Sequence, residues 1–368
     1  MYVLIFIVVI VALIVVHEFG HFVVAKWSGM RVDEFGLGYP PRAMTIANKG
    51  GTLYTLNWLP FGGFVKIYGE DGLSPDSARD ARAFSSKPRL AQALVLVAGV
   101  AMNFLFAYVL ITGALIAGTP RALSFDELAV AEQMELAVAQ VLPGSPAARA
   151  GLLPGDVILS AEDGHYVFKE TDPAAFTKFV SNGGGNTSIA LSVRHADGEE
   201  ALLFARPETG IIASDPSRSA LGVEVATIGV VPLSFGAALV EGATLTWGVT
   251  KLTAVGLWHF FYGVFTFSAD LSQVAGPVGI AGAVGTASLQ GLGDLFSLMA
   301  IISINLALIN LIPVPALDGG RLLFVLIESI ARRPIKESVT RSLNAASFIL
   351  LILLMVVITA HDIFKIVE

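Results

Sequence analysis

The stretch YVLIFIVVIVALIVVHEFGHFVVAKW, residues 2–27, places the tract HEFGH inside an apolar run that is long enough to cross a membrane. Tyr2 to Val16 contains no charged residue, and the apolar run resumes after the tract until Lys26. Two imidazoles and a carboxylate in hydrocarbon cost several kcal/mol unless they are paired or bind a metal. The stretch therefore predicts a transmembrane helix that carries a functional site.

The spacing H-E-x-x-H has a known chemistry on a helix. His17 and His21 are one turn apart, so they lie on the same face and can share one zinc ion. Glu18 lies beside them, where a carboxylate can activate water. The pattern predicts His17 and His21 as metal ligands and Glu18 as the catalytic residue. The alternative role for Glu18 is to compensate the charge of the histidines.

The composition is that of an integral membrane protein. Hydrophobic residues make up 54% of the 368 residues, charged residues only 14%, and the mean hydropathy is +0.72. Soluble domains contain about 25% charged residues. The long uncharged runs predict four membrane spans, which are Met1 to Val16 extended through HEFGH, Leu90 to Pro120, Leu295 to Leu317, and Ser342 to Ala360.

Cysteine and charge exclude several classes of function. The chain has no cysteine, so metal ligands have to be histidine, aspartate or glutamate. The net charge is −7 and no basic tract is present, which gives no indication of nucleic-acid binding. The first apolar run continues into KWSGM instead of a small-residue cleavage site, so we expect it to remain as a helix.

The positions of lysine and arginine predict the orientation. Residues 26–89 contain nine of them and residues 318–341 contain five, which places both loops in the cytoplasm. Residues 121–294 and both termini then lie outside. A fifth crossing by the borderline run 252–269 would break this pattern, so we expect residues 233–294 to form interfacial amphipathic helices.

Asp318 is the best candidate for a third metal ligand. It ends the third span on the predicted cytoplasmic side, within the sequence NLIPVPALDGGR, and His17 and His21 approach that same side. Asn310 and Pro313 interrupt the helix at membrane depth, where irregular backbone is tolerated only if protein or a wet cavity satisfies it. The alternative is a simple charge at a helix end before a Gly-Gly turn.

These motifs resemble the site-2 protease family of intramembrane zinc metalloproteases, in particular the bacterial regulator-of-sigma-E protease type. The resemblance rests on HEFGH, on GVAMN in the second span and on NLIPVPALDGGR in the third. EFGLGYPPR, NWLPFGGFVKIYGED and SQVAGPVGIA extend it over nearly the whole chain. One departure is Val100, where the second-span motif usually has proline. Another is that the external segment has the length and the sequence signature of one PDZ domain, whereas some members have two.

The resemblance implies that His17, His21 and Asp318 hold Zn²⁺ and that Glu18 is a general base and then a proton donor. It also implies substrate-binding residues, for which the candidates are Asn310, Pro313, Asn103, Gly62 and Gly63. For Asn103, a packing hydrogen bond between helices is the alternative.

Residues 43–68 predict a β-hairpin on the cytoplasmic side. AMTIAN and TLYTLNW are strand-like runs separated by Lys49-Gly50-Gly51, and WLPFGGFV is too apolar for an ordinary cytoplasmic loop. We expect the hairpin to dip toward the site and pair with an extended substrate by strand addition. The alternative is a hairpin that only covers the helix ends.

Residues 121–232 predict an extracytoplasmic α+β domain and linker. Residues 137–164 are similar to the core of PDZ domains, with a strand, a carboxylate-binding-like loop, a short helix and a second strand. FTKFVSN adds a helix, and TSIALSVRHADGEEALLFARP alternates like a hairpin. PDZ domains bind chain ends. The sequence leaves open whether this domain captures substrates or excludes them.

The expected fold is thus a multi-pass α-helical membrane protein with a membrane-associated hairpin and a PDZ domain. Its parts are an N-terminal membrane core (1–120), the PDZ domain and linker (121–232), interfacial helices (233–294) and a C-terminal membrane core (295–368).

The functional hypothesis is an intramembrane zinc endopeptidase in the bacterial cytoplasmic (inner) membrane. By family analogy its substrates are single-span proteins, such as anti-sigma factors, or remnant signal peptides, cut after a site-1-type protease has acted first. The alternatives are a catalytically silent scaffold that recruits partners through its PDZ domain, and a metal transporter.

Overall fold

The computed structural model describes residues 2–70, 80–123, 125–182, 187–195, 198–212, 215–231, 233–266, 275–333 and 335–367. The chain divides into two compact units. Residues 1–115 and 235–368 form the first, here called the membrane unit. Residues 116–234 form the second, here called the β unit.

Four described helices of the membrane unit are long and apolar enough to cross a membrane, which confirms an integral membrane protein. They are α1 (Tyr2–Trp27), α2 (Arg89–Ala117), α7 (Leu292–Leu311) and α9 (Glu337–Val367). The third predicted span was too long at its end, since α7 stops at Leu311 instead of Leu317. Pro313 and Pro315 cannot continue a helix, and the chain turns there.

Three further helices complete the membrane unit, namely α5 (Phe235–Phe265), α6 (Pro277–Gln290) and α8 (Asp318–Ala331). α5 is one continuous helix and does not belong to the four candidate spans. It exposes Trp247, Trp258 and Tyr262, as expected of a helix at a lipid interface. Its depth in a bilayer stays a prediction.

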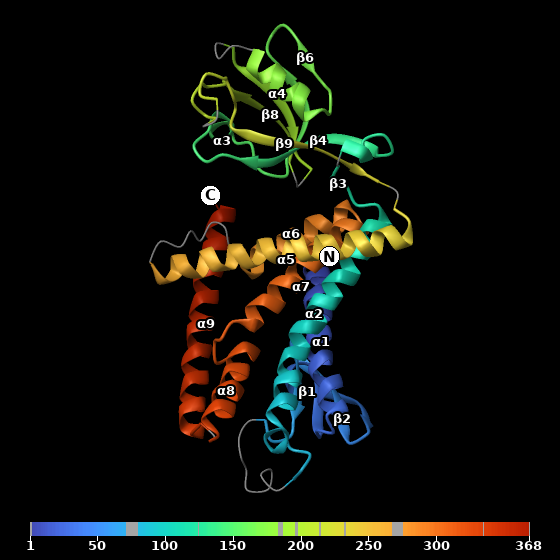
Figure 1. Cartoon of the computed structure of the whole chain (residues 1–368), viewed down its shortest axis with the longest axis vertical. Coiled ribbons are helices and arrows are strands. Elements are labelled where there is room, and N and C mark those ends of the chain that lie inside the picture. Colours follow the sequence, from blue (N-terminus) through green and yellow to red (C-terminus); the bar gives the residue numbers. More distant parts are fainter. Residues whose placement is uncertain are drawn as a thin grey trace. The chain divides into compact units, whose positions relative to one another are not determined.

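Strands β1 (Val32–Lys49) and β2 (Thr52–Ile67) form the hairpin. It begins at Val32, well before the predicted start at residue 43, because residues 34–37 pair with both halves of β2. Gly50 and Gly51 make the turn with positive φ, which a two-residue hairpin turn of this type requires. In Figure 1 the hairpin lies at one end of the membrane unit, and both chain termini lie at the other, near α5 and α6.

A buried cluster fixes the hairpin and α8 against α1 and α2. Its members come from all four elements, from the segment between α1 and β1, and from the segment just before α2. They are Ala25, Met30, Val32, Ile67, Phe84, Val95, Leu96 and Val325. Because these side chains are packed, the ends of α1, α2 and α8 are held in one arrangement.

The β unit is an α+β fold on one antiparallel sheet. Its elements are β3 (Arg121–Ala122), β4 (Glu132–Val141), α3 (Pro146–Ala150), β5 (Val157–Glu162), β6 (Val167–Phe168), α4 (Pro173–Asn182), β7 (Ile189–Arg194), β8 (Glu200–Ala205) and β9 (Val223–Val230). The strand order is β3-β9-β4-β5-β7-β8, and β6 pairs with β5.

Sequence reasoning missed β9, which is the partner of β4 along most of its length. The sequence VEVATIGV alternates as a strand should, but it lies far along the chain from β4 and next to no predicted hairpin. The core packs α4 on the sheet through Phe176 and Val180, which are 2% and 5% exposed.

Candidate metal centre

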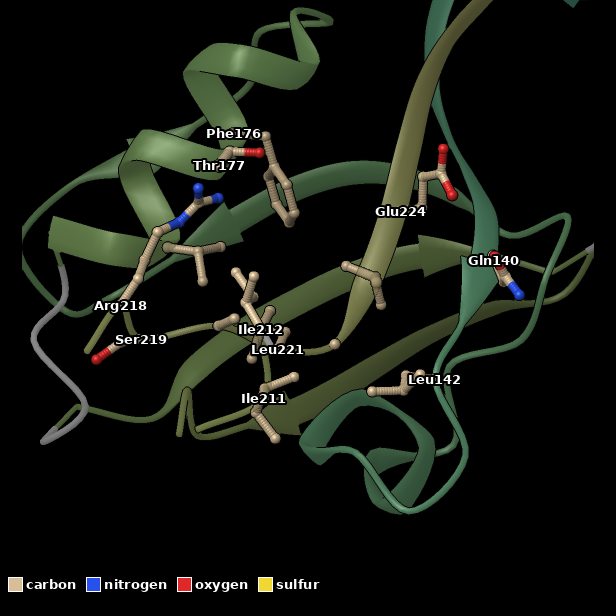
Figure 2. A pocket seen from close by; sticks show the side chains of 14 residues that line it. Gln140, Leu142, Phe176, Thr177, Ile211, Ile212, Arg218, Ser219, Leu221 and Glu224 are labelled. Atoms are coloured by element: carbon tan, nitrogen blue, oxygen red, sulfur yellow. The ribbon is translucent and has the colours of Figure 1, made fainter. Parts of the chain in front are cut away.

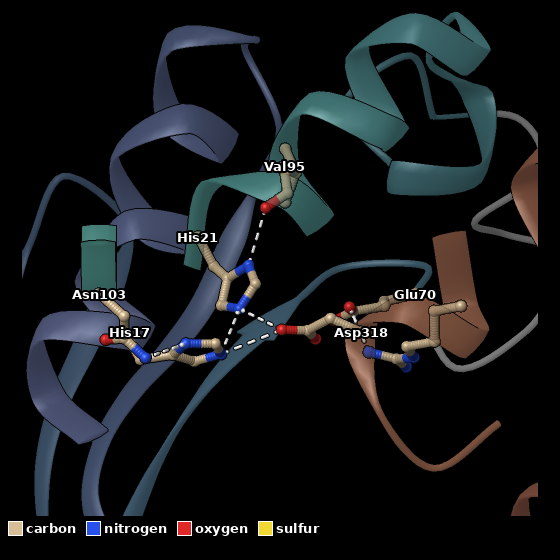
Figure 3. A network of polar contacts seen from close by, with 7 residues as sticks. His17, His21, Glu70, Val95, Asn103 and Asp318 are labelled. Carbon is tan, nitrogen blue, oxygen red and sulfur yellow. Dashed lines mark hydrogen bonds and ion pairs between the residues drawn. The ribbon is translucent and has the colours of Figure 1, made fainter. Parts of the chain in front are cut away.

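Three predicted ligands meet in the membrane unit. His17 and His21 project from one face of α1, and Asp318 is the first residue of α8. The Nε2 atom of His17 lies 3.0 Å from Oδ2 of Asp318 and 3.1 Å from Nε2 of His21. The Nε2 atom of His21 lies 3.2 Å from the same Asp318 oxygen. Figure 3 shows the three side chains converging on one point.

This donor set fits a tetrahedral zinc ion. Zinc bonds to histidine nitrogen and carboxylate oxygen are about 2.0–2.2 Å long, so neighbouring ligand atoms of a tetrahedron are about 3.3–3.5 Å apart. The observed triangle is only slightly smaller. Three protein ligands leave one position for water or substrate, which is the arrangement of catalytic zinc sites, whereas structural zinc sites use four protein ligands.

The centre is buried, and the two imidazoles favour the charged form of its acid. His17 and His21 are each 7% exposed. Burial alone would raise the pKa of Asp318, but hydrogen bonds and charge interactions with the two imidazoles outweigh it and hold this pKa well below its usual range. The lowered pKa favours the carboxylate form of Asp318, which is the form that binds a metal.

Gly99 on α2 makes room for the two imidazoles. A Cβ atom at this position would lie 2.3 Å from Nε2 of His21 and 2.8 Å from Cε1 of His17. Atoms that are not bonded cannot approach so closely, so glycine is required for packing here. The sequence placed Gly99 in the GVAMN motif, one turn from Asn103 in a possible packing contact between helices, but did not predict its contact with the histidines.

Both imidazoles also contact α2 through their second ring nitrogens. Nδ1 of His21 lies 2.8 Å from the carbonyl oxygen of Val95, and Nδ1 of His17 lies 3.1 Å from the carboxamide nitrogen of Asn103. Asn103 was predicted to bind substrate. Here its side chain is fully buried and contacts a predicted metal ligand (Figure 3).

Val100 does not disturb the second span. α2 runs unbroken from Arg89 to Ala117, and Val100 is a buried residue within it. Valine has the backbone N–H that proline lacks, so the helix continues through this point. The departure from the family motif therefore leaves the helix geometry regular.

One ion pair and two glycines set the position of Asp318. A Cβ atom on Gly319 or Gly320 would lie 2.3 Å from the carbonyl oxygen of Leu311 or 2.2 Å from that of Val314, so the chain turns back tightly just after α7. Arg321 then binds Glu70 at 2.5 Å. The close approach of the backbone at Leu311 and Val314 explains why Asp318 is followed by two glycines.

A cavity of about 440 Å³ opens beside the predicted ligands. Its lining contains the candidate base Glu18 and the candidate substrate residues Asn310, Gly62 and Gly63. The other lining residues are Ile10, Ile14, His17, Tyr39, Leu306, Ala316, Leu317 and Asp318. Pro313 is exposed in the loop between α7 and α8 and lies outside this lining.

Comparison with known proteins points to one family. The family model described as Peptidase family M50 matches residues 5–354. A protein of Nostoc sp. is 33% identical over 349 residues, covering 94% of this chain and 91% of that protein. One of Clostridium perfringens is 33% identical over 365 residues, covering 99% and 98%. One of Synechocystis sp. is 32% identical over 358 residues, covering 96% and 92%. Each carries the name "putative zinc metalloprotease".

Proposed function

The chain belongs to peptidase family M50 and is an integral membrane zinc metalloprotease, and from this premise we propose that it is an intramembrane endopeptidase of the regulator-of-sigma-E protease type. The observation that carries the proposal is the place of the HEFGH tract. His17 and His21 lie in a candidate membrane span, within 3.2 Å of the acid that begins α8. A hydrolytic centre at that depth suits peptide bonds of membrane-spanning segments.

In this proposal His17, His21 and Asp318 hold zinc and Glu18 moves protons. Zinc, when bound, supplies Lewis-acid chemistry that acidifies water and polarises a carbonyl group. The Glu18 carboxylate takes a proton from the attacking water and later gives one to the leaving amide nitrogen. Support comes from the cavity, whose lining includes Glu18 together with His17 and Asp318.

The hairpin offers a place for an unwound substrate. A helix that opens in lipid leaves amide groups without partners, at a cost of several kcal/mol each. Gly63 begins the β2 segment that pairs with residues 34–37, and a Cβ atom at this position would lie 3.6 Å from Cγ of Glu18. We infer that an extended substrate adds to this strand edge, which brings its backbone next to the base. In this proposal Asn310, which lines the same cavity, hydrogen-bonds that backbone.

We further propose that the β unit is a PDZ domain that takes chain ends. A groove of about 300 Å³ lies between α4 and β9 (Figure 2). β4 pairs with one edge of β9. On the other edge, the hydrogen bonds of the described residues 121–123 reach residues 227–229, so in this proposal a chain end adds to the start of β9. The half-buried Arg218 lines the groove and suits a terminal carboxylate.

The groove is lined mainly by residues outside the predicted carboxylate-binding loop. The sequence suggested the loop that follows β4, and Leu142 of that loop does line the groove. The larger part of the lining comes from α4 and from residues 218–224. Whether chain-end binding captures substrates or excludes intact ones is an outcome for experiment.

For location, we propose a bacterial cytoplasmic (inner) membrane with the site toward the cytoplasm and the β unit and termini outside. The lysines and arginines of residues 26–89 and 318–341 support it. The hairpin and the termini also lie at opposite ends of the membrane unit (Figure 1). The proposed substrates are single-span proteins, such as anti-sigma factors already shortened by a site-1-type protease, or remnant signal peptides.

The test compares the wild type with Glu18→Gln in vesicles that contain a single-span substrate shortened on its outer side. We expect the variant to keep its zinc and to lose cleavage by about 10²–10⁴-fold, because glutamine cannot carry the proton. Cleavage by Glu18→Gln at the wild-type rate would defeat the mechanism. A wild type that contains no zinc and cuts nothing would favour the silent scaffold.

A further inference from the structure

One stripe of α2 contacts both predicted histidine ligands. Val95, Gly99 and Asn103 are spaced four residues apart, so they lie on one face of the helix. The carbonyl oxygen of Val95 meets Nδ1 of His21, Gly99 leaves space for both rings, and the Asn103 side chain meets Nδ1 of His17. The stripe therefore determines whether Nδ1 of each imidazole donates or accepts a hydrogen bond.

The contact with Val95 fixes the state of His21. A carbonyl oxygen can only accept a hydrogen bond, so Nδ1 of His21 carries the proton and donates it. When the ring is neutral, as a metal-binding histidine is, the lone pair is then on Nε2, the atom that faces His17 and Asp318. This is the tautomer that binds a metal through Nε2.

The contact with Asn103 is different, because a carboxamide has both an acceptor and a donor. If its NH2 group faces Nδ1 of His17, the ring proton must sit on Nε2, which then has no lone pair for a metal. In that orientation Oδ1 of Asn103 is also buried without a hydrogen-bond partner among the described residues, which is an unfavourable arrangement. After a half turn of the carboxamide, Oδ1 accepts the hydrogen bond from Nδ1–H of His17, and the lone pair of that ring is on Nε2.

We propose that Asn103 is a positioning residue of the metal centre, whose carboxamide oxygen accepts a hydrogen bond from Nδ1–H of His17 and so holds that ring in the zinc-binding tautomer. The inference rests on the proposed function for its ligand set. It gives Asn103 a role other than substrate contact or helix packing.

The position of Asn103 is well supported. Its side chain is fully buried, and the Ser303 hydroxyl of α7 donates to its backbone carbonyl at 2.9 Å. α7 therefore holds the turn of α2 that carries the carboxamide. A fixed acceptor at this point limits the ring of His17 to one tautomer and one orientation, as outer partners of metal-binding histidines do.

The test measures zinc affinity of the purified full-length protein by competition with a chelator. Asn103→Leu keeps the approximate volume but has no acceptor, whereas Asn103→Asp keeps one. We expect Asn103→Leu to weaken zinc binding about 10–100-fold and Asn103→Asp to remain within a few-fold of the wild type. The matched control is Asn305→Leu on α7, whose carboxamide donates to the carbonyl oxygen of Ile301 in its own helix.

Two results would overturn the proposal. One is wild-type zinc affinity in Asn103→Leu. The other is an equal loss in Asn103→Leu and Asn103→Asp, because packing, not an acceptor, would then be what matters. Thermal unfolding of each variant in excess zinc separates loss of the ligand site from loss of the fold. If the wild type itself binds no zinc, the proposed function fails as well, so the two failures are distinguishable.

Discussion

The metal centre of the membrane unit and the groove of the β unit are built in opposite ways. The centre joins His17 to Asp318, which are 301 residues apart in the chain, and it depends on the identity of a few buried side chains. The groove is formed by residues 140–224 of one continuous segment and depends mainly on a strand edge and a helix face. Single substitutions should therefore abolish function at the centre and only weaken it at the groove.

The largest effect is expected when a ligand is removed. Asp318→Asn has nearly the same shape but no charge, so we expect zinc affinity to fall by more than about 100-fold, beyond what loss of an outer contact costs. Metal analysis after dialysis measures this. The matched control is Asp294→Asn in the first turn of α7, which should keep its zinc. Equal zinc contents in the two variants would remove Asp318 from the centre.

The next effect comes from a single methyl group. Gly99→Ala would place a carbon 2.3 Å from Nε2 of His21, so one imidazole has to move, and zinc affinity should fall about 10–100-fold.

Gly113→Ala is the matched control on the same helix, since its Cβ would lie 3.4 Å from the nearest atom, in Phe296. This exchange should preserve zinc and raise helix stability by about 0.5–1 kcal/mol. If both alanine variants keep wild-type zinc affinity, Gly99 is not required to make room for the two histidines.

At the groove we expect a smaller, partial loss of peptide affinity. Arg218→Ala removes a half-buried cation but leaves the strand edge, so the affinity for a peptide with a free carboxyl end should fall about 10-fold while zinc content stays unchanged. Fluorescence titration with such a peptide and its amidated form measures this. Arg206→Ala, at an exposed position outside the groove, should bind like the wild type. Equal binding of the free and amidated peptides by the wild type would contradict a carboxylate-binding groove.

The smallest effect concerns the pH dependence of the β unit. Hydrogen bonds from the backbone N–H groups of His165 and Tyr166 hold the pKa of Asp163 below its usual range. A carboxyl group whose pKa is depressed on folding stabilises above its unfolded pKa, and this stabilisation is lost as the pH falls through the folded value. Asp163→Asn should therefore slightly flatten the acid side of the stability profile. Unfolding midpoints between about pH 3 and 7 test this, and an identical profile would contradict it.

The sequence predicted the parts of the fold that depend on local pattern. Four apolar runs gave the four candidate spans, and the Gly50-Gly51 turn gave the hairpin. The start of β1 was missed because residues 34–37 pair with two distant halves of β2. β9 was missed because its partner, β4, is far away in the sequence.

At the site, residue chemistry named the ligand candidates before any geometry was known. The spacing of His17 and His21 and the broken helix before Asp318 were sufficient, and the structure brings these three side chains together. The roles of Gly99 and Asn103 could not be derived in this way. They depend on which face of α2 meets α1, and an almost uniformly apolar helix does not specify that face.

The most direct measurement is anomalous X-ray diffraction at the zinc edge from crystals of the full-length protein. The account predicts a single strong peak about 2.0–2.2 Å from Nε2 of His17, Nε2 of His21 and a carboxylate oxygen of Asp318. A zinc peak elsewhere, or one that Asp318 does not contact, would contradict it.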